Sequence, residues 1–230
     1  MQPPERRESD QDLLLTTVRT YKMRSGRVTT SQRAALDGVA HVYDIGGWDW
    51  PDIRDRAAGR DVVLDIGFGF GDSMLHYAAA EPERFLIGLE VHIPGVGALC
   101  RDAAAAGLGN MCVANEDARQ WLASVAPAGA LAGVRLFFPD PWQKKRHHKR
   151  RFIRQPVLDL LAQKCRSGAF LHIATDWADY AEDAAAELGA SSLWDLQPGT
   201  QHRRGRPVTR FERRALADGR PVVDLLAVRV

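Results

Sequence analysis

Acidic side chains stand at or just after the end of each of the five buried strands that the apolar runs of this sequence predict. They are Asp65, Glu90, Asp117, Asp140 and Asp176. Because the carboxyl ends of parallel strands meet at one edge of a sheet, we expect these side chains to share one rim. A single acid in such a place often only caps the following helix. A whole group of them on one rim favours a ligand that carries positive charge.

The stretch 134–154 (VRLFFPDPWQKKRHHKRRFIR) combines a strand, an acid and a cationic run. Pro139 and Pro141 lack backbone donors and force the chain out of the sheet. The break leaves Asp140 beside Trp142. The cations that follow are Lys144, Lys145, Arg146, Lys149, Arg150, Arg151 and Arg154. This grouping predicts a nucleic-acid substrate that is delivered to a small polar site.

The distribution of charge supports a nucleic-acid partner more than the total charge does. The formal net charge is only +2, but thirteen of the 31 Lys and Arg residues fall within 144–154 and 203–214. A solvated basic face is the ordinary explanation of one such run. Two runs, one of them directly after a strand-end acid, favour binding of a polyanion.

A glycine-rich turn, 67–71 (GFGFG), follows the first predicted strand. The dinucleotide pattern G-x-G-x-x-G does not fit, because its third glycine position would be Asp72 or Met74. So many carboxylates would also repel the negative charge of a pyrophosphate. S-adenosylmethionine carries a sulfonium and an ammonium, and its ribose hydroxyls suit Glu90, 23 residues after Gly67. We therefore expect S-adenosylmethionine in preference to a nicotinamide cofactor, with Gly67 and Gly69 allowing close approach of the backbone.

Composition narrows the class of protein further. The 45% hydrophobic fraction suffices for a core, and 230 residues suit one large domain or a domain with a small extension. Cys100, Cys112 and Cys165 are odd in number and widely spaced, which supports neither a disulfide framework nor a zinc site, and no other metal site is indicated. Neither a signal peptide nor an apolar run of the roughly 18 residues that a membrane span needs is present, so a cytoplasmic protein without a membrane partner is expected.

Strand and helix patterns alternate from residue 61 onward and predict βαβ units. The expected strands are 61–66, 85–89, 110–114, 134–138 and 169–175. The turn 217–220 (ADGR) separates two strand-like runs, 211–216 and 222–230, and predicts a closing antiparallel hairpin. The fold class is therefore α/β with a mostly parallel sheet.

Six motifs carry a resemblance to a known family. In order they are 64–69 (LDIGFG), 88–92 (GLEVH), 138–142 (FPDPW), 145–151 (KRHHKRR), 175–177 (TDW) and 209–213 (TRFER). Together they resemble the bacterial tRNA (guanine-N7-)-methyltransferases, from about residue 16 to the end. The Pro-Asp-Pro-Trp motif with its basic run is the specific part. One departure is Asp65, where the family more often has Glu.

The resemblance implies a Rossmann-like class I methyltransferase fold with a seven-stranded sheet, and methylation of the variable-loop guanine, conventionally position 46 of tRNA. From the composition and the strand and helix patterns we expect a domain at 61–230, a basic extension packed on it at 16–60 and a disordered tail at 1–15. By the resemblance, Asp140 would be the active-site acid. The residues expected at the cofactor are Asp65, Gly67, Gly69, Glu90, Asp117 and Asp140. Those expected at the substrate are Lys144, Arg146, Lys149, Arg150, Arg151, Asp176, Thr209, Arg210, Phe211 and Glu212.

The requirements for methylation at N7 of guanine follow from the chemistry of the base itself. N7 of guanine carries an in-plane lone pair and no proton, so its methylation needs alignment and removal of water more than a general base. A carboxylate would stabilise the cationic product or accept hydrogen bonds from the guanine edge, with Asp140 as the first candidate and Asp176 as the second. Trp142 and Phe211 are candidates for stacking on a base. A core strand position is the other interpretation of Phe211.

Other functions remain open on sequence alone. Asp140-Pro141-Trp142 is also similar to the Asp-Pro-Pro-aromatic motif of methyltransferases that act on exocyclic amines, although the second proline is missing. A tRNA-binding protein that kept the fold without catalysis is a second alternative. tRNA is the expected partner of the methyltransferase that the resemblance implies and of the non-catalytic alternative. No obligate protein partner is evident.

Overall fold

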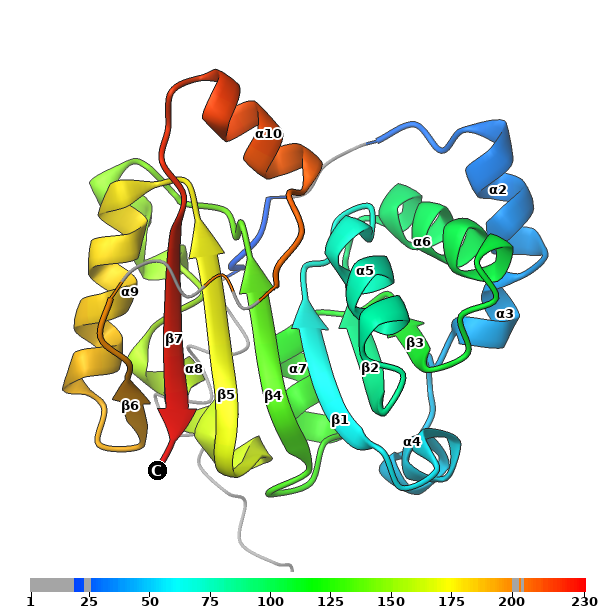
Figure 1. Cartoon of the computed structure of the whole chain (residues 1–230), viewed down its shortest axis with the longest axis horizontal. Coiled ribbons are helices and arrows are strands. Elements are labelled where there is room, and N and C mark those ends of the chain that lie inside the picture. The colour runs from blue at the N-terminus through cyan, green and yellow to red at the C-terminus, as the bar shows by residue number, and fades with distance from the viewer. Residues whose placement is uncertain (1–18, 23–25, 200–202, 204) are drawn as a thin grey trace, which may run out of the picture.

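The computed structural model describes residues 19–22, 26–199, 203 and 205–230. Within them the chain forms a seven-stranded sheet with the order β3-β2-β1-β4-β5-β7-β6 (Figure 1). The strands are β1 (Asp61–Ile66), β2 (Arg84–Leu89), β3 (Met111–Ala114), β4 (Leu131–Phe137), β5 (Cys165–Thr175), β6 (Trp194–Leu196) and β7 (Val223–Arg229). The tail expected at 1–15 lies outside the described residues.

The sheet is parallel from β3 to β5 and antiparallel at its other edge. β1 pairs in parallel with β2 and β4, and β4 with β5. β7 runs antiparallel to β5 on one side and to β6 on the other. The prediction of a mostly parallel seven-stranded sheet with an antiparallel C-terminal part is confirmed.

The hairpin predicted around 217–220 is wrong in its first arm. Residues 210–217 form a helix, α10 (Arg210–Ala217), and the antiparallel neighbours of β7 are β5 and β6 instead. The physical reason is a helical start signal: the side chain of Thr209 caps the helix by accepting a hydrogen bond from the N–H of Glu212. Glu212 and Ala215 are buried three residues apart, which is a helical and not a strand period.

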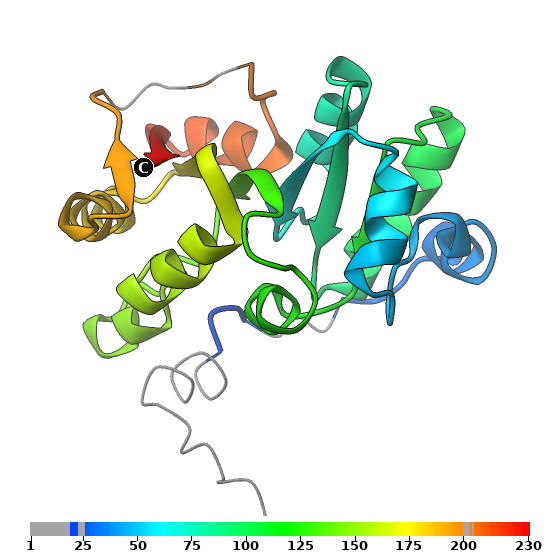
Figure 2. The same ribbon diagram turned by 90° about the horizontal axis from the view of Figure 1, so that it is seen from below.

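Helices cover both faces of the sheet (Figures 1 and 2). One face packs against α4 (Trp50–Ala57), α7 (Ala118–Ser124), α8 (Gln155–Lys164) and α9 (Ala178–Ala190). The other packs against α3 (Ala40–Tyr43), α5 (Asp72–Ala80) and α6 (Ile93–Ala105). α2 (Thr30–Asp37) lies against α6.

Burial on both faces explains why the strands read as continuous apolar runs. Val62, Leu64 and Ile66 of β1 join the core on one side of the sheet, and Val63 joins the core on the other. Ile53 of α4 belongs to the same core as β1. The division into an extension at 16–60 and a domain at 61–230 stays a prediction. Within the proposed extension, α4 packs into the same core as β1.

Three short elements are not predicted by the hydrophobic periodicity of the sequence. They are α3, the edge strand β6 and a 3₁₀ helix η1 (Lys145–Arg150) in the middle of the basic run. Each is too short to show a hydrophobic period. In the part of the chain that the structure describes, no helix combines the length and the apolar character that crossing a membrane requires.

Candidate active site

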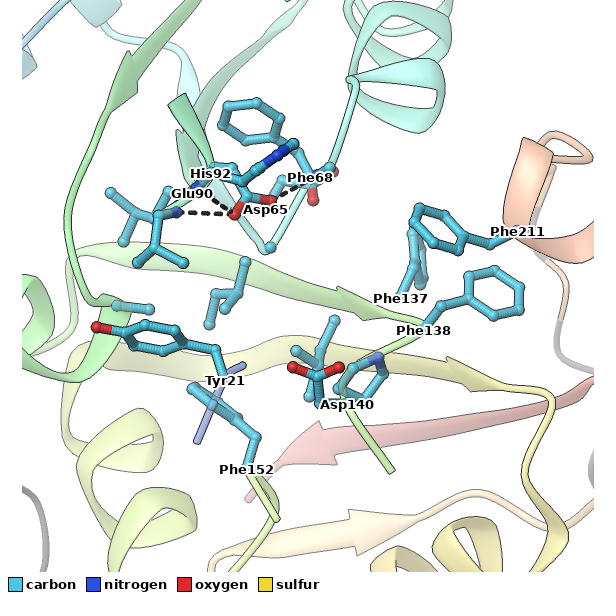
Figure 3. Close-up of a pocket in the computed structure, with 18 of the residues that line it drawn as sticks. Tyr21, Asp65, Phe68, Glu90, His92, Phe137, Phe138, Asp140, Phe152 and Phe211 are labelled. Carbon is cyan, nitrogen blue, oxygen red and sulfur yellow. Dashed lines mark hydrogen bonds between the residues drawn. The ribbon is translucent and has the colours of Figure 1, made fainter. Parts of the chain in front are cut away.

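A pocket opens at the carboxyl ends of β1, β2 and β4, where the strand-end acids were expected. Asp65, Gly67, Gly69, Glu90, Asp117 and Asp140 all line it. On the other side it is bordered by residues 20–22 from the N-terminal segment and by residues 209–211 from the start of α10. Figure 3 shows Asp65 and Glu90 on one side of the pocket and Asp140, Phe138 and Phe211 on the other.

The glycine turn is held in place by Glu90. Gly67, Gly69 and Gly71 all have positive φ angles (70°, 61° and 90°), which only glycine adopts readily. Oε2 of Glu90 accepts a hydrogen bond from the N–H of Gly69 at 2.7 Å, while Oε1 accepts from the N–H groups of Val91 and His92. The carboxylate at the end of β2 thus fixes the turn that follows β1.

Asp65 is buried beneath this turn. Its side chain is 2% exposed, and its Oδ2 atom has no hydrogen-bond partner among the described residues. Burial raises the pKa of Asp65 to about 7, against the opposing effect of the Arg135 guanidinium and with a further increase from Glu90. A buried acceptor without a partner at the wall of a pocket is suited to a ligand that donates hydrogen bonds.

Asp117 has its own partner within the fold. It caps α7 by accepting a hydrogen bond from the N–H of Arg119, and the Arg119 guanidinium lies 3.0 Å from its Oδ2. The carboxylate is therefore oriented at the edge of the pocket while its charge is balanced.

Asp140 is joined to the N-terminal segment. Its Oδ2 accepts a hydrogen bond from the backbone N–H of Lys22 at 2.7 Å. Trp142, two residues later, is 6% exposed and donates its indole N–H to the carbonyl of Thr20 at 2.9 Å. Cations of Lys22 and Arg150 lie over its ring, 5.5 and 4.8 Å from the centroid. In this arrangement Trp142 acts as an anchor inside the protein, and it is not among the residues that line the pocket.

Two phenylalanines form the opposite wall. The rings of Phe138 and Phe211 stack with centroids 6.3 Å apart and planes at 20°. Phe138 directly follows β4 and has a φ of +53°, and Phe211 lies in the first turn of α10 and is half-buried. Sequence reasoning missed Phe138, although an aromatic directly before the Pro-Asp-Pro break was a usable signal. The core strand interpretation of Phe211 is excluded by the helix.

Arg210 and Thr209 also reach the pocket. The guanidinium of Arg210 pairs with Asp72 at 2.8 Å and lies 4.4 Å from the ring centroid of Phe70. Together with the cap at Thr209, this pair attaches the first turn of α10 to the first turn of α5.

Seven of the residues predicted at the substrate lie outside the pocket lining: Lys144, Arg146, Lys149, Arg150, Arg151, Asp176 and Glu212. Lys144, Arg146 and Lys149 are exposed, whereas Arg150 is half-buried against Trp142. Asp176 forms an ion pair with Arg220 at 2.9 Å.

Arg151 and Glu212 are occupied within the fold. The Arg151 side chain is 1% exposed and pairs with Asp179 and, at 3.1 Å, with Asp183. Glu212 is 2% exposed and pairs with Arg206 at 2.7 Å. Both were expected to contact the substrate, but each is buried in an ion pair that stabilises the fold, and neither is presented to a ligand here.

Comparison with known proteins agrees with the fold. A family model described as "Putative methyltransferase" matches residues 59–225. Among solved structures, the 16S rRNA (adenine(1408)-N(1))-methyltransferase from Catenulisporales acidiphilia is similar, with a TM-score of 0.53 and 20% identity over 79% of this chain and 94% of that one. An antibiotic-related methyltransferase gives a TM-score of 0.55 at 18% identity over 79% of this chain and 94% of that one. At such identities these likenesses establish the methyltransferase fold.

Curated relatives are much more similar in sequence. The tRNA (guanine-N(7)-)-methyltransferase of Halorhodospira halophila is 45% identical over 90% of this chain and 93% of its own length. The protein of the same name from Shewanella amazonensis is 40% identical over 96% of both chains. With this identity over nearly the whole length, the chain belongs to the tRNA (guanine-N(7)-)-methyltransferase family.

Proposed function

We propose that this protein transfers a methyl group from S-adenosylmethionine to N7 of a guanine in tRNA, at position 46 in the variable loop. The observation that carries the proposal is a pocket with carboxylates on one side, and an acid beside two stacked aromatic rings on the other. Relatives that bear the name of this activity match the chain over 90% of its length or more.

The residues on the strand-end side fit S-adenosylmethionine. Asp65 offers a buried oxygen without a partner to an ammonium group. Glu90 already accepts three backbone hydrogen bonds, and a carboxylate has about four acceptor positions, so one remains for a ribose hydroxyl. A Cβ atom at Gly67 would meet no atom of the described residues within 4 Å, which leaves space for a ligand against the backbone. When bound, the cofactor supplies a methyl group activated by a sulfonium.

The other wall fits a purine base. Phe138 and Phe211 present flat apolar surfaces, and base stacking on such rings contributes roughly 1–3 kcal/mol per base. N7 of guanine needs no general base, so the protein must align the base and exclude water. The ring becomes cationic on methylation, and the Asp140 carboxylate at the pocket wall would stabilise that charge or accept from the guanine edge.

Cations on both sides of the pocket suit the RNA backbone. Lys144, Arg146 and Lys149 are exposed on one side, after β4. Arg210 and Arg213 are exposed on α10, on the other side. Phosphate contacts of this kind position a nucleic acid without reading its sequence.

The test is methylation of unmodified tRNA with labelled S-adenosylmethionine, followed by nuclease digestion and mass spectrometry. We expect N7-methylguanosine in the variable loop. Asp140→Asn should lower the rate by about 10²-fold, the loss typical of one well-placed electrostatic group, with little change in melting temperature. Asp61→Asn is the matched control, because Asp61 lies at the start of β1, pairs with Arg166 at 2.6 Å and does not line the pocket. A methylated exocyclic amine in the wild-type product, or normal turnover by Asp140→Asn, would contradict the assignment.

A further inference from the structure

The N-terminal segment 19–22 lies against the loop that carries Asp140, although the hydrogen-bonded residues are 118 positions apart in the sequence. Thr20, Tyr21 and Lys22 line the same pocket as Asp140. We propose that this segment, anchored by Trp142, is a positioning element that orients the Asp140 carboxylate through the backbone N–H of Lys22. The proposal rests on the proposed function of Asp140 and adds Trp142 and the Lys22 amide to the machinery.

The contact to Asp140 is a hydrogen bond from a backbone amide to a carboxylate, at 2.7 Å. Such bonds to a charged acceptor are stronger than neutral ones and restrict the direction of the carboxylate. This restriction matters here because Asp140 lies in an irregular loop between two prolines, outside the helices and strands of the fold. A reacting group that is misplaced by about 1 Å can lose about 10²-fold in rate.

The anchor of the segment is Trp142. Its indole N–H donates to the carbonyl of Thr20 at 2.9 Å, and the Lys22 ammonium lies 5.5 Å from the centroid of its ring. The residues on either side of Tyr21 are therefore both attached to one side chain. Because Trp142 follows Asp140 by two residues, the loop that supplies the acid also supplies the anchor of the group that orients it.

Burial supports this role for Trp142 over stacking on a base. The side chain is 6% exposed, its polar atom is already used, and Arg150 lies 4.8 Å from its ring centroid. His147 meets the same ring edge-on, with centroids 5.9 Å apart. Trp142 thus connects the N-terminal segment, the Asp140 loop and the basic run in a single packed unit.

Two substitutions at one position separate the amide from the side chain. Lys22→Pro removes the N–H that reaches Asp140, whereas Lys22→Ala keeps this N–H and removes only the ammonium. We expect Lys22→Pro to lower kcat for tRNA methylation about tenfold or more, with KM for tRNA and the Kd for S-adenosylmethionine within about threefold of wild type. Lys22→Ala keeps the amide and loses only the cation over the Trp142 ring, so it should lower kcat clearly less than Lys22→Pro does. Trp142→Phe keeps an aromatic ring but loses the indole N–H, and should reduce kcat in the same direction.

The decisive measurement is a double-mutant cycle with Asp140→Ala under single-turnover conditions. If the amide acts through Asp140, Lys22→Pro and Trp142→Phe should have no further effect once the carboxylate is gone. Equal losses in both backgrounds, or a higher KM for tRNA with an unchanged kcat, would overturn the proposal by showing that the segment acts independently. If Lys22→Pro does not fold, Trp142→Phe gives the same comparison. A wild-type product other than N7-methylguanosine would refute the proposed function, and the coupling would still be measured on that product.

Discussion

The buried guanidinium of Arg206 meets the carboxylate of Asp224 through two parallel hydrogen bonds of 2.8 Å, from Nε to Oδ1 and from Nη2 to Oδ2. Asp224 is in β7, and the same guanidinium donates through Nη1 to Glu212 of α10 at 2.7 Å. His172 of β5 also donates to Asp224, at 2.9 Å. One arginine therefore fastens α10, which carries Phe211, to the antiparallel edge of the sheet.

Removal of this arginine should cost much stability. Arg206→Met leaves two buried carboxylates without their shared cation, so we expect the free energy of unfolding to fall by about 3–5 kcal/mol. Arg203→Met is the matched control: its side chain is 41% exposed and pairs with the same Glu212, so its loss should be about 1 kcal/mol or less. Urea denaturation measures both. Similar losses for the two variants would show that α10 is not held by the buried ion pairs.

Cofactor affinity should depend on pH through Asp65. The pKa of this carboxyl is raised to about 7, chiefly by burial, so below pH 7 it is largely protonated in the unliganded protein. An ammonium group binds the ionised form better, so affinity for S-adenosylmethionine should increase as the pH rises from 6 to about 7.5, with proton release below pH 7.

Calorimetry in two buffers of different ionisation enthalpy measures that proton release directly. The stability of the unliganded protein should change with pH in the opposite direction to cofactor affinity. The folded state holds the Asp65 proton to a higher pH than the unfolded chain does, so the free energy of unfolding should fall as the pH rises from about 4 to 7. Asp65→Asn should abolish both dependences. Persistence of the pH dependence in that variant would assign it to another group.

The approach of α6 to the glycine turn should be sensitive to a single methyl group. A Cβ atom at Gly95 would lie 2.0 Å from the carbonyl oxygen of Gly69, so Gly95→Ala must displace one of the two backbones. We expect at least a tenfold weaker binding of S-adenosylmethionine, since Gly69 also carries the hydrogen bond to Glu90. At Gly189 in α9 a Cβ atom would meet no atom within 4 Å in the part of the chain that the structure describes, so Gly189→Ala should stabilise the protein by about 0.5–1 kcal/mol. Normal cofactor binding by Gly95→Ala would show that the turn adapts.

Binding of tRNA should distinguish exposed from buried cations in the basic run. Replacement of Arg146 and Lys149 by Gln should reduce the slope of log K against log salt by roughly 0.7–0.9 for each phosphate contact that is lost. Arg151→Gln should instead lower the melting temperature, because this side chain is 1% exposed and paired with Asp179 and Asp183. An unchanged salt slope in the Arg146 and Lys149 variant would identify the run as a solvated face.

The order of strands and α-helices from residue 61 to 190 follows from the sequence, because buried parallel strands and amphipathic α-helices leave distinct apolar periods. The meeting of Asp65, Glu90, Asp117 and Asp140 in one pocket also follows, because parallel strands place their carboxyl ends at one edge. These are consequences of local pattern and of one topological rule.

Tertiary structure alone decides which charges are free to bind. Arg151 and Arg146 look equivalent in the sequence, but one pairs with acids of α9 and the other is exposed. The sequence predicts a strand at 211–216, yet these residues belong to a helix in which Glu212 is buried in an ion pair with Arg206. Lys22 meets Asp140 across 118 residues. Such contacts depend on which distant groups pack together, and no local period of a sequence records that choice.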